Sequence, residues 1–218
     1  MSKKERASQV FDILQECYPD AKIALNFEDK FQLLVAVVLS AQCTDERVNM
    51  VTPKLFEVYP SIEAFAGAKQ EDLEKLIYST GFFRNKAKNI IGAAKKIVED
   101  FEGEVPGTME QLLTIPGVAR KTANVILSSG FGKNEGVTVD THVIRISGLL
   151  GFVPKKLSKS KNAVKIEQEL MKLFPRDRWG KLSHLLIFHG RQKCIARRPK
   201  CEECRLNELC PSAFKAQR

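Results

Sequence analysis

The sequence contains no long apolar run and almost no strand-like alternation. Its longest uninterrupted apolar stretch, residues 33–39, is far shorter than the roughly 20 residues that span a bilayer as a helix. The opening residues, MSKKERASQ, lack the apolar centre of a signal peptide. Only residues 137–139 have a strand-like composition, and that segment is very short. These absences argue against a membrane span, a secretory leader and a β-sheet. We therefore expect a soluble intracellular protein with no membrane partner.

Internal repeats and low-complexity linkers are also missing. The softest boundary is the stretch GFGKNEG, residues 130–136, where glycines and polar residues separate two helical segments. A chain of 218 residues has room for one large domain or for two smaller domains that share an interface. Hydrophobic residues make up 44% of the chain, which supports a packed core rather than disorder.

The charge balance is strongly basic. Lysine and arginine outnumber aspartate and glutamate by 35 to 26, which gives a formal net charge of +9. A surplus of this size favours an anionic partner, most often nucleic acid, although many basic proteins bind none.

The apolar residues follow a helical period. Within residues 85–103 they recur at steps of three and four, and a glycine and a proline then end the pattern. The same spacing predicts a helix that ends before Pro175 and short helices around residues 73–77 and 182–186. Residues 29–42 are apolar on almost every side, which predicts a buried central helix, with a strand as the alternative that their valines leave open. The predicted fold class is all-α.

Four of the six cysteines lie close together near the end of the chain with the spacing C-x6-C-x2-C-x5-C: Cys194, Cys201, Cys204 and Cys210. In a reducing cytosol, clustered thiols indicate a metal site more than disulfides. Zinc sites usually pair two C-x2-C knuckles, and only one such pair is present, so the spacing leaves zinc and a [4Fe–4S] cluster both open. His184 and His189 are five residues apart, on different sides of a helix, and make a poor metal pair.

The segment IPGVARKTANVIL, residues 115–127, predicts a turn between two helices. In this interpretation Ile115 and Val118 pack inward, and Gly117 permits a positive φ angle. The free N–H groups at the start of the second helix would then suit a DNA phosphate. A turn of this kind between helices is often only a turn, so the sequence leaves phosphate binding as a hypothesis.

Two residues near this turn have chemical potential. Lys121 has three possible roles, as a solvated surface charge, a phosphate ligand or a reactive amine. Its position at the start of a helix and the adjacent Arg120 favour the neutral amine, which a nucleophile requires. Bound DNA phosphates would instead favour the charged ammonium. A nucleotide-binding P-loop is excluded, because that motif needs glycines where Ile115 and Arg120 stand. Asp140 directly precedes the helical segment THVIRISGLL and is expected to cap it, a role compatible with catalysis.

These motifs occur in the order found in one known family. LLTIPGVARKTANVIL followed by VTVDTHV resembles the helix-hairpin-helix and the Gly/Pro–Asp loop of the endonuclease III family of DNA glycosylases. The cysteine spacing and the upstream LSAQCTD are similar to further motifs of that family, so the resemblance covers nearly the whole chain. One departure is Ala119, where the family commonly has glycine; an added Cβ could weaken the grip on phosphate.

The resemblance implies two helical lobes with a DNA-binding cleft between them. The helical barrel domain with the helix-hairpin-helix would span residues 23–132. The iron–sulfur cluster domain would combine residues 1–22 and 133–218, with the four clustered cysteines holding a [4Fe–4S] cluster.

It also implies a base-excision repair enzyme that removes oxidised pyrimidines from duplex DNA. Lys121 would attack C1′ of the damaged nucleotide, displace the base and form a Schiff base with the opened sugar. Asp140 would assist proton transfer and stabilise positive charge on the sugar. Loss of a C2′ proton would then expel the 3′ phosphate, which is AP lyase activity. The lysine places this chain with the bifunctional members rather than with adenine-mismatch glycosylases.

The partner implied is double-stranded DNA with a damaged base or an abasic site, bound by a monomer in the cytoplasm, in association with the nucleoid. Gln42 would enter the gap left by the extruded base, and Phe82 would act as a wedge. The remaining expected DNA contacts are Pro116, Gly117, Val118, Ala119, Arg120, His142, Arg197 and Arg198. For Phe82 the alternative is a core aromatic, and for His142 a packed or surface role.

The sequence leaves three alternative functions open. The first is a glycosylase for another lesion, such as a mismatched or dimerised pyrimidine. A DNA-binding module without catalysis is disfavoured by the combination of Lys121 and Asp140. An iron–sulfur electron carrier is disfavoured by the single cysteine cluster in a large basic chain.

Overall fold

The computed structural model describes residues 1–215, and every regular element within that range is helical, which confirms the all-α prediction. Residues 137–139 form no strand. Among the described residues, no helix combines the length and the apolar character needed to cross a membrane. The chain divides into two compact units, Ala24–Lys133 and the combination of Met1–Ile23 with Asn134–Arg218.

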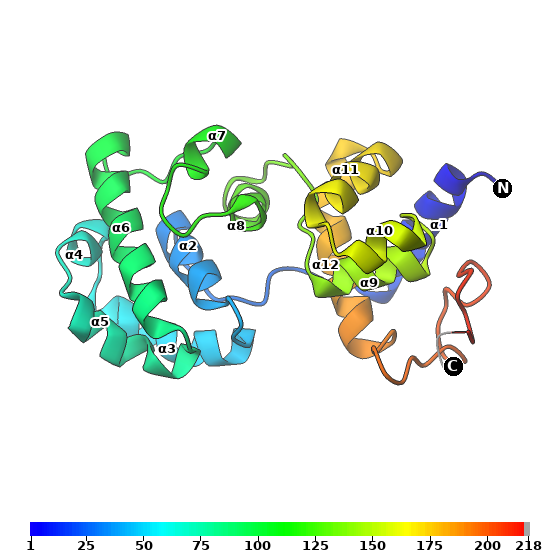
Figure 1. Cartoon of the computed structure of the whole chain (residues 1–218), viewed down its shortest axis with the longest axis horizontal. Coiled ribbons are helices and arrows are strands. Elements are labelled where there is room, and N and C mark those ends of the chain that lie inside the picture. The colour runs from blue at the N-terminus through cyan, green and yellow to red at the C-terminus, as the bar shows by residue number, and fades with distance from the viewer. Residues whose placement is uncertain (216–218) are drawn as a thin grey trace. The chain divides into compact units, whose positions relative to one another are not determined.

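The unit Ala24–Lys133 is contiguous in sequence. Its helices are α2 (Lys30–Leu39), α3 (Asp45–Val58), α4 (Ile62–Ala66), α5 (Gln70–Ile77), α6 (Phe83–Phe101), α7 (Met109–Leu112) and α8 (Arg120–Val125), shown in Figure 1. A 3-10 turn, Tyr78–Thr80, follows α5, and a π-helical turn, Ile126–Gly130, extends α8.

Two helices form the core of this unit for the reasons that the sequence suggests. In α6, Ile90, Ala94 and Ile97 are buried, and the helix packs against α2, α4 and α5. The choice left open for residues 29–42 is resolved as a helix, α2, which is buried on nearly every side. Asp29 starts α2 as its N-cap, since its Oδ1 accepts a hydrogen bond of 2.8 Å from the backbone N–H of Gln32.

The other unit joins the beginning of the chain to its second half. It contains α1 (Lys3–Cys17), α9 (Thr141–Leu149), α10 (Lys155–Ser160), α11 (Ala163–Leu173), a 3-10 turn (Arg176–Arg178) and α12 (Trp179–Gln192). Helix α1 packs against α12 although the two are far apart in sequence. After Gln192 the described chain continues in irregular turns that carry the four clustered cysteines. Arg6 of α1 joins the end of α9 to this segment, since its Nη1 donates to the carbonyl of Leu150 at 2.6 Å and to that of Leu209 at 3.2 Å.

Candidate functional site

The predicted turn between two helices is present between α7 and α8. Ile115 and Val118 are 2% and 6% exposed, which confirms that they pack inward. The N–H of Val118 donates to the carbonyl of Ile115 at 3.1 Å and closes the turn. Gly117 has a φ angle of +79°, and a Cβ there would lie 2.8 Å from Cβ of Asn89 on α6. Only glycine therefore satisfies both the backbone conformation and the close approach to α6.

The structure explains why alanine is tolerated at position 119. Ala119 is the N-cap of α8 with φ −88° and ψ 169°, an extended conformation that any residue adopts. Its side chain cannot cap, and α8 has no side-chain cap. Pro116 and Ala119 are exposed, and Arg120 is half-buried.

Lys121 is the second residue of α8 and is exposed. Its amine makes no hydrogen bond or ion pair with the described residues, so no such contact holds it away from a ligand. The local fold thus presents an uncommitted primary amine directly after a rigid turn, at a helix start where the dipole repels a cation.

Asp140 is the N-cap of α9, as the sequence predicts. Its Oδ1 accepts a hydrogen bond of 2.8 Å from the N–H of Val143, so the carboxylate has a fixed orientation while remaining only half-buried. His142 lies two residues further on, and burial lowers its pKa. Its Nδ1 is buried without a hydrogen-bond partner in residues 1–215 and lies against Gly190 on α12. Lys121 belongs to the unit Ala24–Lys133, whereas Asp140 and His142 belong to the other unit.

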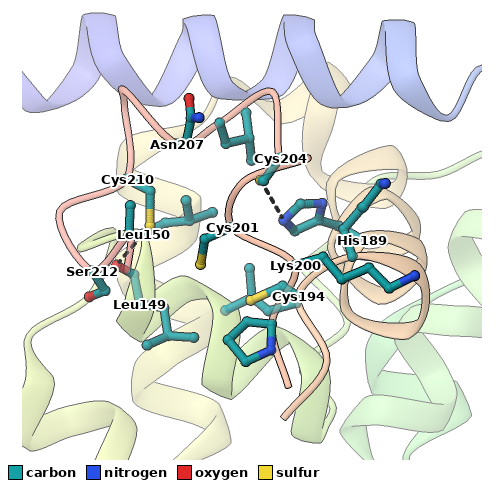
Figure 2. A pocket seen from close by; sticks show the side chains of 15 residues that line it. Leu149, Leu150, His189, Cys194, Lys200, Cys201, Cys204, Asn207, Cys210 and Ser212 are labelled. Carbon is teal, nitrogen blue, oxygen red and sulfur yellow. Dashed lines mark hydrogen bonds between the residues drawn. The ribbon is translucent and has the colours of Figure 1, made fainter. Parts of the chain in front are cut away.

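The four clustered cysteines line one largely apolar cavity, together with residues such as Ile146, Leu150 and Pro199 (Figure 2). All four are free thiols that surround the cavity, and no three His, Cys, Asp or Glu side chains of the described residues are gathered closely enough for a single metal ion. Burial raises the pKa of Cys194, Cys204 and Cys210. Four thiols around one apolar cavity fit a [4Fe–4S] cluster, in which each thiolate binds a separate iron.

Sequence reasoning missed several polar residues that contact these thiols. Arg145 of α9 donates from Nη1 to Sγ of Cys194 at 3.5 Å and lies close enough to oppose the rise in the pKa of that thiol. Nε2 of the buried His189 lies 3.8 Å from Sγ of Cys204 (Figure 2). Its Nδ1 lies 3.2 Å from the hydroxyl of Tyr18. Such contacts orient ligands and tune a metal site. The sequence contains one signal for such a contact, namely that His189 precedes Cys194 by only five residues.

Arg197 and Arg198 lie on an exposed loop between the first two cysteines. The base of the loop is closed by a hydrogen bond of 3.0 Å from the N–H of Lys200 to the carbonyl of Lys193. Pro199, which directly follows the two arginines, is buried and anchors this exposed basic loop on its C-terminal side.

Gln42 and Phe82 lie in two short connections of the unit Ala24–Lys133. Both residues are exposed, and both have left-handed backbones, with φ angles of 52° and 48°. Phe82 is 62% exposed, so the alternative of a core aromatic is wrong. A bulky residue with positive φ is an outlier that the surrounding structure must enforce.

Comparisons with known proteins agree with this geometry. The family model for HhH-GPD superfamily base excision DNA repair proteins matches residues 35–176, and the model for the iron-sulfur binding domain of endonuclease III matches residues 194–210. Endonuclease III of Synechocystis sp. is 57% identical over 97% of this chain and 94% of its own length. A trapped endonuclease III–DNA covalent intermediate, an estranged-adenine complex, superposes with a TM-score of 0.92, 40% identity and full coverage of both chains. A non-covalent endonuclease III–DNA complex gives a TM-score of 0.91 and 40% identity over 99% of this chain and 98% of that one.

Proposed function

Because the chain belongs to the endonuclease III family and is a bifunctional base-excision repair enzyme, a glycosylase for oxidised pyrimidines and an AP lyase, we propose that Lys121 and Asp140 perform its chemistry. It binds damaged duplex DNA, and its iron–sulfur domain carries the four cysteines that begin at Cys194 and end at Cys210. The observation that carries the assignment is the uncommitted amine of Lys121 at the end of a rigid turn.

The proposed reaction follows from the two groups. The Nζ of Lys121 attacks C1′ of the extruded nucleotide, and the C1′–N bond to the base breaks, with the base leaving as its protonated form. The sugar ring then opens as the C1′–O4′ bond breaks, and an imine joins C1′ to Nζ. Removal of a C2′ proton expels the 3′ phosphate by β-elimination. Asp140 receives and returns protons and stabilises the positive charge on the sugar. Its hydrogen bond to the N–H of Val143 holds the carboxylate in the fixed orientation that these roles require.

The remaining expected DNA contacts are proposed on similar grounds. Pro116, Gly117, Ala119 and Arg120 lie at or next to the turn before α8, where backbone N–H groups suit a phosphate, while buried Val118 sets the shape of the turn. Arg197 and Arg198 supply phosphate contacts from their exposed loop. The bound cluster would hold that loop in place, since thiolates on both sides of the loop ligate it.

His142, Gln42 and Phe82 are proposed to act nearer the lesion. Burial lowers the pKa of His142, which favours the neutral imidazole as a lining of the base pocket. Gln42 and Phe82 project from exposed connections and would fill the gap that the extruded base leaves. We further propose that the enzyme acts as a monomer on nucleoid DNA in the cytoplasm.

The test is chemical trapping. Borohydride added during turnover on a duplex with one oxidised pyrimidine should yield a covalent protein–DNA adduct, and Lys121→Ala should yield none. Lys95→Ala, which removes an exposed lysine from α6, is the control that should trap normally. A full yield of adduct from Lys121→Ala would refute the assignment.

Asp140→Asn separates capping from catalysis. The amide oxygen can still accept the hydrogen bond from Val143, so the folded protein should be retained while base excision falls by a hundredfold or more, in the range of about 10²–10⁴ for general acid–base catalysis. Excision at the rate of the unchanged protein would show that Asp140 is only a cap.

A further inference from the structure

Lys86 is a buried cation that the proposed reaction does not use. It lies in the first turn of α6 and is 4% exposed, and it is the only lysine or arginine of the described residues that is buried to this extent. Its Nζ donates two hydrogen bonds of 2.7 Å, one to the carbonyl of Leu39 and one to the carbonyl of Thr80. One ammonium group therefore joins the end of α2 to the turn that precedes α6.

Burying an ammonium is costly unless its hydrogens are bonded, so this arrangement needs a reason. Leu39 is the last residue of α2, where carbonyls lack donors within the helix and the helix dipole favours a cation. Lys86 supplies a donor that this helix end requires. Burial lowers the pKa of Lys86, because the two carbonyls replace only part of the water that would otherwise surround the ammonium.

The two carbonyls lie directly before the two segments proposed to enter DNA. Gln42 follows Leu39 by three residues, and Phe82 follows Thr80 by two. Gly81 and Phe82 are left-handed in succession, with φ angles of 71° and 48°. The N–H of Lys86 also donates to the carbonyl of Phe82 at 3.1 Å. Lys86 thus holds the Phe82 segment through its backbone and its side chain and the Gln42 segment through its side chain.

We propose that Lys86 is a positioning residue that fixes the Gln42 and Phe82 segments relative to each other before DNA binds. The proposal rests on the DNA contacts proposed above for Gln42 and Phe82. Left-handed conformations at non-glycine residues are costly and persist only where their surroundings enforce them. Without the shared ammonium, the backbones of both segments could adopt other conformations. Ordering them again when DNA binds would cost conformational entropy, which reduces the binding energy available to open the duplex.

The experiment compares two substrates with Lys86→Gln and the control Lys95→Gln, which changes an exposed lysine of the same helix. One substrate is a duplex with an oxidised pyrimidine, which requires base extrusion. The other is a single-stranded oligonucleotide with a preformed abasic site, which requires none. Lys86→Gln should lower kcat/KM on the duplex by about ten- to a hundredfold, the range for losing a hydrogen bond to a charged group, and leave cleavage of the single strand unchanged.

A double-mutant cycle separates positioning from general stability. In a Phe82→Ala, Gln42→Ala background, Lys86→Gln should have little further effect on duplex excision, because the groups that it positions are gone. An equal loss on both substrates, additive losses in the cycle, or full duplex activity of Lys86→Gln would each overturn the proposal.

Two outcomes need separate handling. If Lys86→Gln does not fold at the assay temperature, Lys86→Arg takes its place with the same expectations, because a guanidinium keeps the charge, but its larger planar group does not match a buried site that holds a compact ammonium. If the Phe82→Ala, Gln42→Ala protein itself excises from the duplex at the rate of the unchanged protein, the proposed DNA contacts of these two residues have failed, whatever Lys86→Gln does.

Discussion

Replacing Gly117 with alanine tests whether the turn before α8 is as constrained as its geometry indicates. A φ angle of +79° costs an L-residue about 1–2 kcal/mol. The new Cβ would also lie 2.8 Å from Cβ of Asn89, a contact with no flexible side-chain end to move, which adds about 1–3 kcal/mol of overpacking. We expect Gly117→Ala to lower the free energy of unfolding by about 2–5 kcal/mol, a large share of the usual stability of a domain.

The protein can escape this cost only by moving the turn away from α6, and that movement would displace Lys121. Urea unfolding followed by circular dichroism measures the first effect, and excision on a damaged duplex measures the second. Ala119→Gly is the matched control two residues away: φ is already −88° and glycine is favoured over alanine at an N-cap, so the freer unfolded chain should lower the free energy of unfolding by at most about 1 kcal/mol. If Gly117→Ala leaves both unfolding and excision unchanged, the reasoning about the turn is wrong.

Three further predictions concern the other unit. Changing Arg197 and Arg198 to glutamine should reduce the slope of log affinity against log salt by about 0.9 for each phosphate that is no longer neutralised, measured by fluorescence anisotropy; an unchanged slope would remove the loop from the DNA interface. Cys204→Ser should lose iron and visible absorbance, because the cluster needs all four thiolates, and iron content equal to that of the unchanged protein would contradict this. Burial lowers the pKa of His184 from 6.5, so the unfolded chain binds a proton that the folded one does not, and the free energy of unfolding should fall as pH drops below 6.5. His184→Gln should flatten that dependence by at most about 1.4 kcal/mol per pH unit in thermal unfolding across the range from about pH 5 to 7; an identical slope would exclude His184 as a source.

Much of the fold was predictable because the buried residues are periodic. Ile90, Ala94 and Ile97 occupy one face of a helix by spacing alone, and that face is buried in α6. Asp140 was predictable as a cap because capping depends on residues next to it in sequence. Position 119 needed the structure, since only the φ angle of −88° shows that alanine fits where the family commonly has glycine.

Contacts between distant residues were not predictable in the same way. Lys86 precedes Ile90 by four residues and so shares its face of α6, but its partner Leu39 lies 47 residues away in the sequence. Tyr18 and His189 meet across 171 residues, and Arg145 reaches Cys194 across 49. A pattern of residue types contains no record of which helices pack together, and these contacts depend on that packing.

The division of the chain has a consequence for the order of folding during synthesis. The unit Ala24–Lys133 is one continuous segment, so it can complete its core as soon as that segment leaves the ribosome. Helix α1 precedes that segment but packs against α12 and is tied by Arg6 to Leu209, so it completes its contacts only after the second half of the chain has been made. Its apolar face, with Val10, Phe11 and Leu14, stays unpartnered throughout that interval. A segment made before the unit Ala24–Lys133 therefore reaches its native position after that unit has folded, and in the interval its apolar face is open to chaperones, proteases and misassembly.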